Sequence, residues 1–287
     1  MEIEGWRYYN HAAVPTCLLD ESHNLQPLED GSIWRLTAKN GGGKNSLLAK
    51  YDTNFDCAEE TSFWYIIKDG PFVLDELSQK QRHHIRTALK RCRVERIVAA
   101  EHADELYEVY HAAYASYDQP DNERSRENFN RRYLQSNEDC WAAFSIEDGT
   151  MAGFMFCKNM GRYSETVMAK YHPAYQKLQP SNAIHATILD YYLNILGQKF
   201  VCSGSRNIKH KTNVQEYKLQ HWKFRKAYCH LHVVVNPKYR VAVRLAYSAR
   251  GVLSLLDRIP KIHQLNSMLS LYGLSVEYQT RSEERRV

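Results

Sequence analysis

The sequence has little of what would place it in a specialised structural class. Glycine and proline are scarce, at 13 and 8 of 287 residues, which excludes collagen-like and low-complexity chains. No run of about 18 apolar residues is present, so no segment is predicted to span a membrane. No repeat of fixed period is visible, which argues against solenoids and propellers.

Cysteine is also used sparingly, and never in the pairs that bind metal or carry redox chemistry. The seven cysteines are scattered singly, without a CxxC pair, which argues against a zinc ribbon or a redox motif. The first five residues are acidic and lack the apolar core of a signal peptide. We therefore expect a reduced, cytoplasmic protein, and the residues indicate no metal.

What the sequence does contain is typical of a globular protein. Hydrophobic residues make up 44% and charged residues 25%, and the length suits one large domain or two modest ones. The net charge of +5 is too small by itself to indicate a nucleic-acid partner. The 20 tyrosines predict either amphipathic ring surfaces along a cleft or interface, or half-buried packing.

The first 75 residues are predicted to form short strands and turns. Ser32–Thr37 and Ser46–Tyr51 flank a turn-rich stretch that contains Gly41–Lys44, which favours a hairpin. A phosphate loop would need serine or threonine after the lysine and then a helix, whereas Asn45 and a predicted strand follow here. Thr61–Lys68 is predicted to be a further strand.

A basic helix is predicted from about Leu74 to Cys92, followed by a strand over Val94–Val98. One side of the helix is apolar and the other carries a run of lysines and arginines, Lys80 to Arg93. The run is either a solvated helix face or a surface for a polyphosphate, a lipid headgroup or an RNA backbone.

The segment from about 101 to 235 is predicted to alternate as α α β β β α β α β. Glu147–Thr150 contains an Asp-Gly turn between two apolar runs, which indicates a hairpin. Ser181 is predicted to cap a helix whose stripe runs through Ile195, and Lys199–Cys202 is predicted to be a short central strand. This order predicts an α+β fold, in which helices cover both faces of a mixed, mostly antiparallel sheet.

The predicted elements divide the chain into three segments. Residues 1–97 form a strand-rich segment that ends in the basic helix, residues 98–237 form the α+β domain, and residues 238–287 form a helical extension, broken at Pro260, with a charged tail.

The stretch from Phe200 to Lys226 concentrates polar groups after a buried strand. Ser203, Ser205, Arg206 and His210 precede a helix that a capping box at Thr212–Gln215 is predicted to open. A helix N-terminus adds positive potential to such a loop, so Ser203 to Gln215 is predicted to line the active cleft. The alternatives are that Thr212 and Gln215 only cap the helix and that Arg206 only pairs with a carboxylate.

His230 and His232 share one face of a predicted strand, but spacing supplies no third ligand, so a structural role is favoured over a metal site.

Three segments together resemble the GNAT superfamily of N-acetyltransferases, in the branch that contains the Fem-type peptidoglycan-bridge aminoacyl ligases and similar proteins of surface-polysaccharide clusters. Ser78–Lys90 is similar to the SKxxRxxIRxALK helix of that branch. Leu178–Ala183 precedes the helix at which GNAT proteins bind a pyrophosphate. Asn213–Lys226 resembles the branch's FGFRK ending. The resemblance covers about half of the chain well, and the first 75 residues resemble a reduced first lobe of the two-lobed Fem proteins.

The resemblance implies an acyltransferase that moves an acetyl or similar group from acyl-coenzyme A to an amine or hydroxyl of a small molecule or sugar. The donor would lie between Glu165–Tyr171 and Lys199–Cys202, and the acceptor would attack its carbonyl directly. His210 is the candidate base, because imidazole titrates near neutrality, and Tyr217 is the candidate acid. The substrate-binding candidates are Ser203, Ser205, Arg206, Asn213 and Tyr171, and the cofactor-binding candidates are Gln179, Ser181, Asn182 and Ala183.

One departure from the family pattern keeps two alternatives open. GNAT enzymes usually cradle the coenzyme A pyrophosphate with a glycine-rich loop, whereas Gln176–Ala183 contains no glycine. Fem-type proteins also depart there and take acyl groups from aminoacyl-tRNA, so the alternatives are a tRNA-dependent ligase, with tRNA on the Lys80–Arg93 helix, and a non-catalytic binding module.

Overall fold

The computed structural model describes residues 2–9, 11–37, 45–117, 123–207 and 213–284, and the chain forms two compact units. Unit 1 comprises Met1–Tyr65, Ser205–Thr212 and Lys226–Val287, and unit 2 comprises Ile66–Gly204 and Asn213–Arg225. Neither unit is continuous in sequence, whereas the predicted segments 1–97, 98–237 and 238–287 follow one another along the chain. That linear division stays a prediction.

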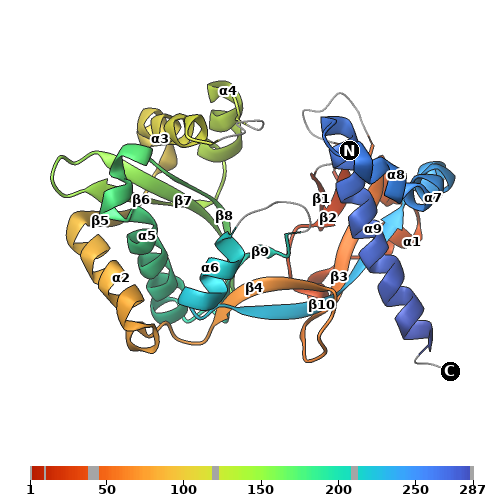
Figure 1. Cartoon of the computed structure of the whole chain (residues 1–287), viewed down its shortest axis with the longest axis horizontal. Coiled ribbons are helices and arrows are strands. Elements are labelled where there is room, and N and C mark those ends of the chain that lie inside the picture. Colours follow the sequence, from red (N-terminus) through yellow and green to blue (C-terminus); the bar gives the residue numbers. More distant parts are fainter. Residues whose placement is uncertain (1, 10, 38–44, 118–122, 208–212, 285–287) are drawn as a thin grey trace. The chain divides into compact units, whose positions relative to one another are not determined.

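Unit 2 is built on a mixed, mostly antiparallel sheet (Figure 1). Strands β5, β6, β7 and β8 pair antiparallel in that order, and β9 pairs parallel with β8. The helical crossover between β8 and β9 is the one that the sequence predicts. The strands span Cys92–Ile97 (β5), Asp139–Ser145 (β6), Met151–Asn159 (β7), Ser164–Tyr171 (β8) and Phe200–Ser205 (β9).

Helices cover both faces of this sheet, which confirms the predicted α+β class (Figure 1). Helix α3 packs on β7 and β8, while α5 packs across β5 to β7 on the opposite face and contacts α2. The helices of the unit are α2 (Gln79–Arg91), α3 (Ala103–Ala115), α4 (Arg126–Phe129), α5 (Pro180–Leu189) and α6 (Val214–His221). Short helical turns are η3 (Leu74–Glu76), η4 (Ala99–His102), η5 (Asn130–Leu134), η6 (Pro173–Leu178) and η7 (Asp190–Ile195).

Aromatic side chains fill the core between α3, α4 and the sheet. Tyr110, Phe129, Phe154 and Phe156 are buried in one cluster, in which neighbouring rings meet at tilted or T-shaped angles. At its edge the Lys170 ammonium lies 3.9 Å from the centroid of the Tyr114 ring and 4.7 Å from that of Tyr117. Much of the tyrosine enrichment in this unit therefore serves packing and cation–π contact.

Unit 1 combines a sheet with the C-terminal helices. Its strands follow the order β1, β2, β3, β10 and β4, with β1–β2 and β3–β10 antiparallel and β2–β3 parallel. They span Trp6–Tyr9 (β1), Ala12–Pro15 (β2), Leu48–Cys57 (β3), Phe63–Asp69 (β4) and Arg225–Val235 (β10). Unit boundaries fall inside β4, β9 and β10.

Two small hydrophobic clusters hold unit 1 together. One surrounds Trp6 and Ile33, and the other joins Val235, Val243 and Leu269 beneath the C-terminal helices. Its helices are α1 (Gln26–Glu29), α7 (Arg240–Ser248), α8 (Arg250–Leu255) and α9 (Pro260–Glu284), with turns η1 (Asp20–Ser22), η2 (Ser32–Arg35) and η8 (Pro237–Tyr239). Pro260 begins α9, as its fixed φ favours at a helix start.

Two local predictions are wrong. Ser32–Thr37 was expected as a strand, but Ser32–Arg35 forms a 3₁₀ turn after Gly31, whose φ of 74° ends the preceding segment. Ile195 was expected on the buried stripe of its helix, yet it is 67% exposed. The helix widens into a π-turn over η7, which shifts the phase of the side chains that follow.

Candidate functional site

Strands β8 and β9 run parallel and separate after a short paired stretch. Ser164 pairs with Val201 and Glu165 with Cys202. Beyond these pairs a side-chain contact joins the strands, in which the Thr166 hydroxyl lies 3.2 Å from Ser203 Oγ. Diverging carboxyl ends of parallel strands leave room for a ligand between them.

A β-bulge at Val167 determines which side chains of β8 share a face with Thr166, the residue that contacts β9. The register with β7 steps from Cys157–Thr166 to Phe156–Met168, so Thr166 and Tyr171 lie on the same face of β8. Opposite Tyr171 is Gly153, where an added Cβ would lie 2.6 Å from the Tyr171 ring. The bulge and this glycine together place the Tyr171 ring on the face that carries Thr166.

The Tyr171 hydroxyl is enclosed and has no hydrogen-bond partner among the residues that the structure describes. Burial raises the pKa of this phenol well above its ordinary value, so it stays protonated. An unpartnered buried hydroxyl costs about 1–3 kcal/mol, which a substrate atom would relieve. This placement suits the predicted substrate role of Tyr171.

Lys218, on α6, is the most unusual charged group of unit 2. Its side chain is buried, with 5% of the residue exposed, and its Nζ donates a hydrogen bond to Ser203 Oγ. Desolvation lowers the pKa of this ammonium to about 8, against the smaller opposing influence of the Cys157 and Cys202 thiols. A lysine so placed is close to half protonated at mildly alkaline pH.

His185, on α5, is held as a neutral imidazole near this lysine. Its Nδ1 lies 2.7 Å from the Ser181 carbonyl oxygen, and its Nε2 is enclosed without a partner in the described part of the chain. Desolvation, aided by the Lys218 charge, lowers the pKa of His185 to about 3. The ring lies against the buried Trp222, so packing and the Ser181 contact fix its orientation.

The start of α5 differs from the prediction. Gln179, in the left-handed region with a φ of 59°, occupies the N-cap and Pro180 the first helical position, so Ser181 is not the cap. The backbone N–H groups of Asn182 and Ala183 already donate to the Gln179 carbonyl oxygen, at 2.9 and 3.4 Å. Few backbone donors remain for a phosphate, and cofactor binding by Gln179, Ser181, Asn182 and Ala183 stays a prediction.

Side chains from three helices meet over that N-terminus. Gln81 Nε2 of α2 donates to Asn182 Oδ1 at 3.1 Å, and Asn182 Nδ2 donates to Gln179 Oε1 at 3.0 Å. The Tyr217 hydroxyl of α6 lies 3.4 Å from both Gln81 Oε1 and Asn182 Oδ1. Tyr217 is 42% exposed, so its hydroxyl lies where solvent meets this amide network.

Helix α6 begins one residue later than the predicted capping box requires. Asn213 occupies the N-cap without a side-chain capping bond, and the helix starts at Val214. The box at Thr212–Gln215 is therefore not the cap, and Thr212 itself lies outside the described residues. Asn213 is exposed, and its substrate role stays a prediction.

The remaining predicted site residues belong to unit 1 or lie outside the described part. Arg206 donates from its backbone N–H to the Trp64 carbonyl oxygen at 2.8 Å and from its guanidinium to that of Ser62. Ser205 begins the same segment of unit 1. His210, the predicted base, lies outside the described residues, so its role is still a prediction.

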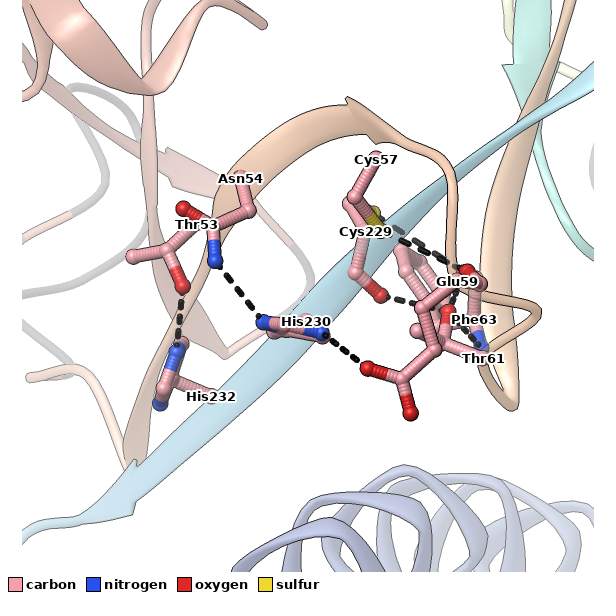
Figure 2. A network of polar contacts seen from close by, with 9 residues as sticks. All are labelled: Thr53, Asn54, Cys57, Glu59, Thr61, Phe63, Cys229, His230 and His232. Atoms are coloured by element: carbon pink, nitrogen blue, oxygen red, sulfur yellow. Dashed lines mark hydrogen bonds and ion pairs between the residues drawn. The ribbon is translucent and has the colours of Figure 1, made fainter. Parts of the chain in front are cut away.

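The paired histidines of β10 have structural partners in unit 1 (Figure 2). His232 Nε2 lies 2.8 Å from the Thr53 hydroxyl, and His230 lies between Asn54 Nδ2, at 3.2 Å, and the Glu59 carboxylate, at 3.8 Å. The register with β3 confirms that both imidazoles share one face. Within the described ranges, no three His, Cys, Asp or Glu side chains are grouped as a metal site would require.

Two other features bear on ligand binding. A hollow of about 410 Å³ lies in unit 1 between α7, α8 and α9, and none of the predicted site residues lines it.

On α2 the basic run is mainly exposed, and Asp75 pairs with Arg82 and Arg86 at 3.1 and 3.7 Å.

Comparison with solved structures places this fold. FemX superimposes with a TM-score of 0.54 at 11% identity, over 76% of this chain and 78% of that chain. Also similar are L-PGS from Bacillus licheniformis, with a TM-score of 0.48 at 14% identity over 81% and 80%, and a tandem GNAT protein from the clavulanic acid biosynthesis pathway, with a TM-score of 0.41 at 10% identity over 78% and 75%. No family model matches the sequence, and no curated protein matches it. The fold is GNAT-like and similar to that of FemX.

Sequence reasoning missed Lys218 and Thr166. Lys218 lies one helical turn before the buried Trp222 and thus on the same face of α6, a spacing that could have indicated a buried lysine. No comparable signal indicates Thr166, because its direction depends on the bulge in β8.

Proposed function

We propose that this protein is an acyltransferase in which an activated acyl donor lies between the diverging ends of β8 and β9 and an amine or hydroxyl acceptor attacks its carbonyl directly. The GNAT-like fold supports the reaction class. The observation that carries the proposal is the buried Lys218 ammonium on Ser203 Oγ, at the point where the two strands separate.

The hydrogen bonds of Ser203 give its hydroxyl a defined chemical role. A serine hydroxyl has one donor and two acceptor sites. Lys218 Nζ donates to one acceptor site and the Thr166 hydroxyl to the other. The Ser203 hydroxyl proton is then available to donate to a third atom. The two hydrogen bonds that Ser203 Oγ accepts, one of them from a cation, polarise the O–H bond and make it a better donor. Such a donor stabilises the oxyanion of a tetrahedral intermediate.

Two tyrosines complete the proposed site. Tyr171, held protonated by burial, donates to the substrate, and Tyr217 at the exposed edge of the amide network returns a proton to the leaving group. His210 remains the proposed base. Ser205, Arg206 and Asn213 remain proposed contacts of the acceptor.

A direct assay tests the proposal. We expect Ser203→Ala and Lys218→Met to lower turnover by about 100-fold, the effect of removing an oxyanion donor, while donor affinity changes little. Lys177→Met is the matched control, because this exposed lysine of unit 2 interacts through its backbone carbonyl. Full turnover in both site variants would contradict the proposed mechanism.

The donor itself is proposed as acyl-coenzyme A, and a specific observation favours aminoacyl-tRNA as the second candidate. The Asn182 and Ala183 amides of α5 are occupied, while α2 exposes Lys80 and Lys90, which would meet an RNA backbone. Calorimetry with acetyl-coenzyme A and filter binding with charged tRNA over a salt series separate the two. Reversing Lys80 and Lys90 to glutamate should abolish tRNA binding and flatten its salt dependence, while leaving coenzyme A binding intact.

Failure to bind or consume either donor would leave the third possibility, a binding module that keeps the fold without turnover.

A further inference from the structure

The helices α7 and α8 of unit 1 expose aliphatic side chains that a solvated helix would bury. On α7, Val243 points into the cluster with Val235 and Leu269, while Val241 and Leu245, one turn apart, are exposed. After Arg250 four further aliphatic side chains are exposed: Val252 and Leu255 on α8, and Leu256 and Ile259 in the turn that follows it. Leu255 is 80% exposed and Val252 65%.

Both helices contribute a side chain to the same hydrophobic cluster. Val243 of α7 belongs to the cluster and Leu253 of α8 packs against it, whereas the neighbouring aliphatic side chains are exposed. The two helices follow one another directly and contact each other (Figure 1). The six exposed aliphatic side chains of α7, α8 and the turn after α8 are here called the α7–α8 surface: Val241, Leu245, Val252, Leu255, Leu256 and Ile259.

The charge around this surface has one sign. Between Pro237 and Val276 the chain has six lysines and arginines and a single acidic residue, Asp257. The Asp257 carboxylate is occupied by His263 and by Asn266, at 3.0 and 2.7 Å. Four cations lie beside the residues of the α7–α8 surface in the sequence: Arg240, Arg244, Arg258 and Lys261. None of them pairs with a carboxylate that the structure describes.

We propose that the α7–α8 surface docks this protein on the face of an anionic lipid bilayer. Aliphatic side chains flanked by cations match the boundary between headgroups and acyl chains, where the acyl chains take up apolar surface and the phosphates attract positive charge. In the described part of the chain, no helix is long and apolar enough to cross a membrane, so the contact is interfacial. This docking is independent of the proposed acyl transfer.

The charge also discriminates against other occupants. A second copy of this chain would bring the same cations against each other, which a symmetric contact disfavours. A nucleic acid would neutralise the cations but leave the aliphatic stripe in water.

Vesicle sedimentation tests the proposal on the full chain. The wild type should sediment with phosphatidylcholine vesicles that contain about one third phosphatidylglycerol, and not with phosphatidylcholine alone, because the anionic surface supplies much of the attraction. The double variant Val252→Ser and Leu255→Ser should bind at least about tenfold less, since hydroxyls forfeit the apolar transfer. Both positions are largely exposed, so the fold should tolerate the changes.

Two controls separate docking from simple charge adhesion. Ile195→Ser removes an exposed aliphatic side chain of unit 2 and should leave vesicle binding unchanged. Reversal of Lys80 and Lys90 on α2 should also leave it unchanged. In addition, Leu255→Trp should show fluorescence that acyl-brominated phosphatidylglycerol quenches beyond the wild-type background.

Three results would overturn the proposal: equal sedimentation with neutral and anionic vesicles, undiminished binding of the serine variant, or a dimer in the absence of lipid that the same serines convert to monomer.

Discussion

Both units bury an ionisable side chain, and they compensate for it differently. In unit 1 the Asp52 carboxylate, with 4% of the residue exposed, accepts a hydrogen bond of 2.9 Å from the Tyr65 hydroxyl and lies near the Lys50 ammonium. In unit 2 Lys218 has no carboxylate beside it among the described residues, and its ammonium donates to the Ser203 hydroxyl.

The two groups differ in their partners: Asp52 accepts from Tyr65 at Oδ1 and has no hydrogen-bond partner at Oδ2 in the described part of the chain, whereas Lys218 donates to a neutral hydroxyl. Burial raises the pKa of Asp52 to about 6, although Tyr65, His23 and Lys50 oppose the shift. Burial lowers the pKa of Lys218 to about 8. A buried charge without an opposite charge beside it lowers stability, and we expect both groups to be visible in the pH dependence of unfolding.

The largest expected effect tests whether the units are independently stable. Phe154→Ala removes a fully buried ring from the aromatic core of unit 2 and should lower the free energy of unfolding by about 3–5 kcal/mol. Hydrogen exchange should show lower protection of the backbone amides in β6 to β8. The strands β1 to β3 should keep their protection, and equal loss there would mean that the two units unfold together.

Lys218→Met sharpens the comparison most directly. Between pH 8 and 10.5 the unfolded chain binds a proton at this lysine that the folded chain does not, so wild-type stability should rise with pH across that window. Below pH 8 the folded chain carries the full cost of burying the charged ammonium. Methionine removes this cost and should raise the free energy of unfolding by about 3 kcal/mol at pH 7. Denaturant unfolding at several pH values measures both effects, and a destabilised variant would show that the ammonium is well compensated.

Gly153→Ala tests the positioning of Tyr171. The new methyl would lie 2.6 Å from the Tyr171 ring and 3.0 Å from the Lys170 carbonyl oxygen, so we expect a loss of about 2 kcal/mol. If Tyr171 contacts substrate, turnover should fall as well. Gly149→Ala is a poor control because its φ is 74°, whereas Gly251→Ala is suitable, since nothing lies within 4 Å of its added Cβ.

Asp52→Asn gives the smallest effect and the opposite sign of pH dependence. Between pH 3.8 and 6 the folded chain binds a proton that the unfolded chain does not, so this carboxyl lowers stability as pH rises. Asparagine keeps an acceptor for Tyr65, and we expect a gain of about 1 kcal/mol at pH 7. The slope over that window should flatten in the variant, and an unchanged slope would locate the titration elsewhere.

The sequence alone determined the elements of unit 2 and their order. Hydrophobic periodicity, the Asp-Gly hairpin and the short apolar run at Lys199–Cys202 are local signals, and the order of helices and strands from α3 to β10 is the predicted one, although α5 and α6 do not begin at the predicted caps. Polarity similarly identified the exposed basic side of α2.

Tertiary structure decided what local signals cannot carry. The units are discontinuous, because β4 and β10, far apart in sequence, contribute to both. Tyr171 and Thr166 share a face only because of the bulge at Val167. The pKa of Lys218 is lowered because folding removes water from its ammonium. Sequence specifies which residues alternate or repeat along an element, but register, desolvation and contact between distant segments arise only when the chain packs.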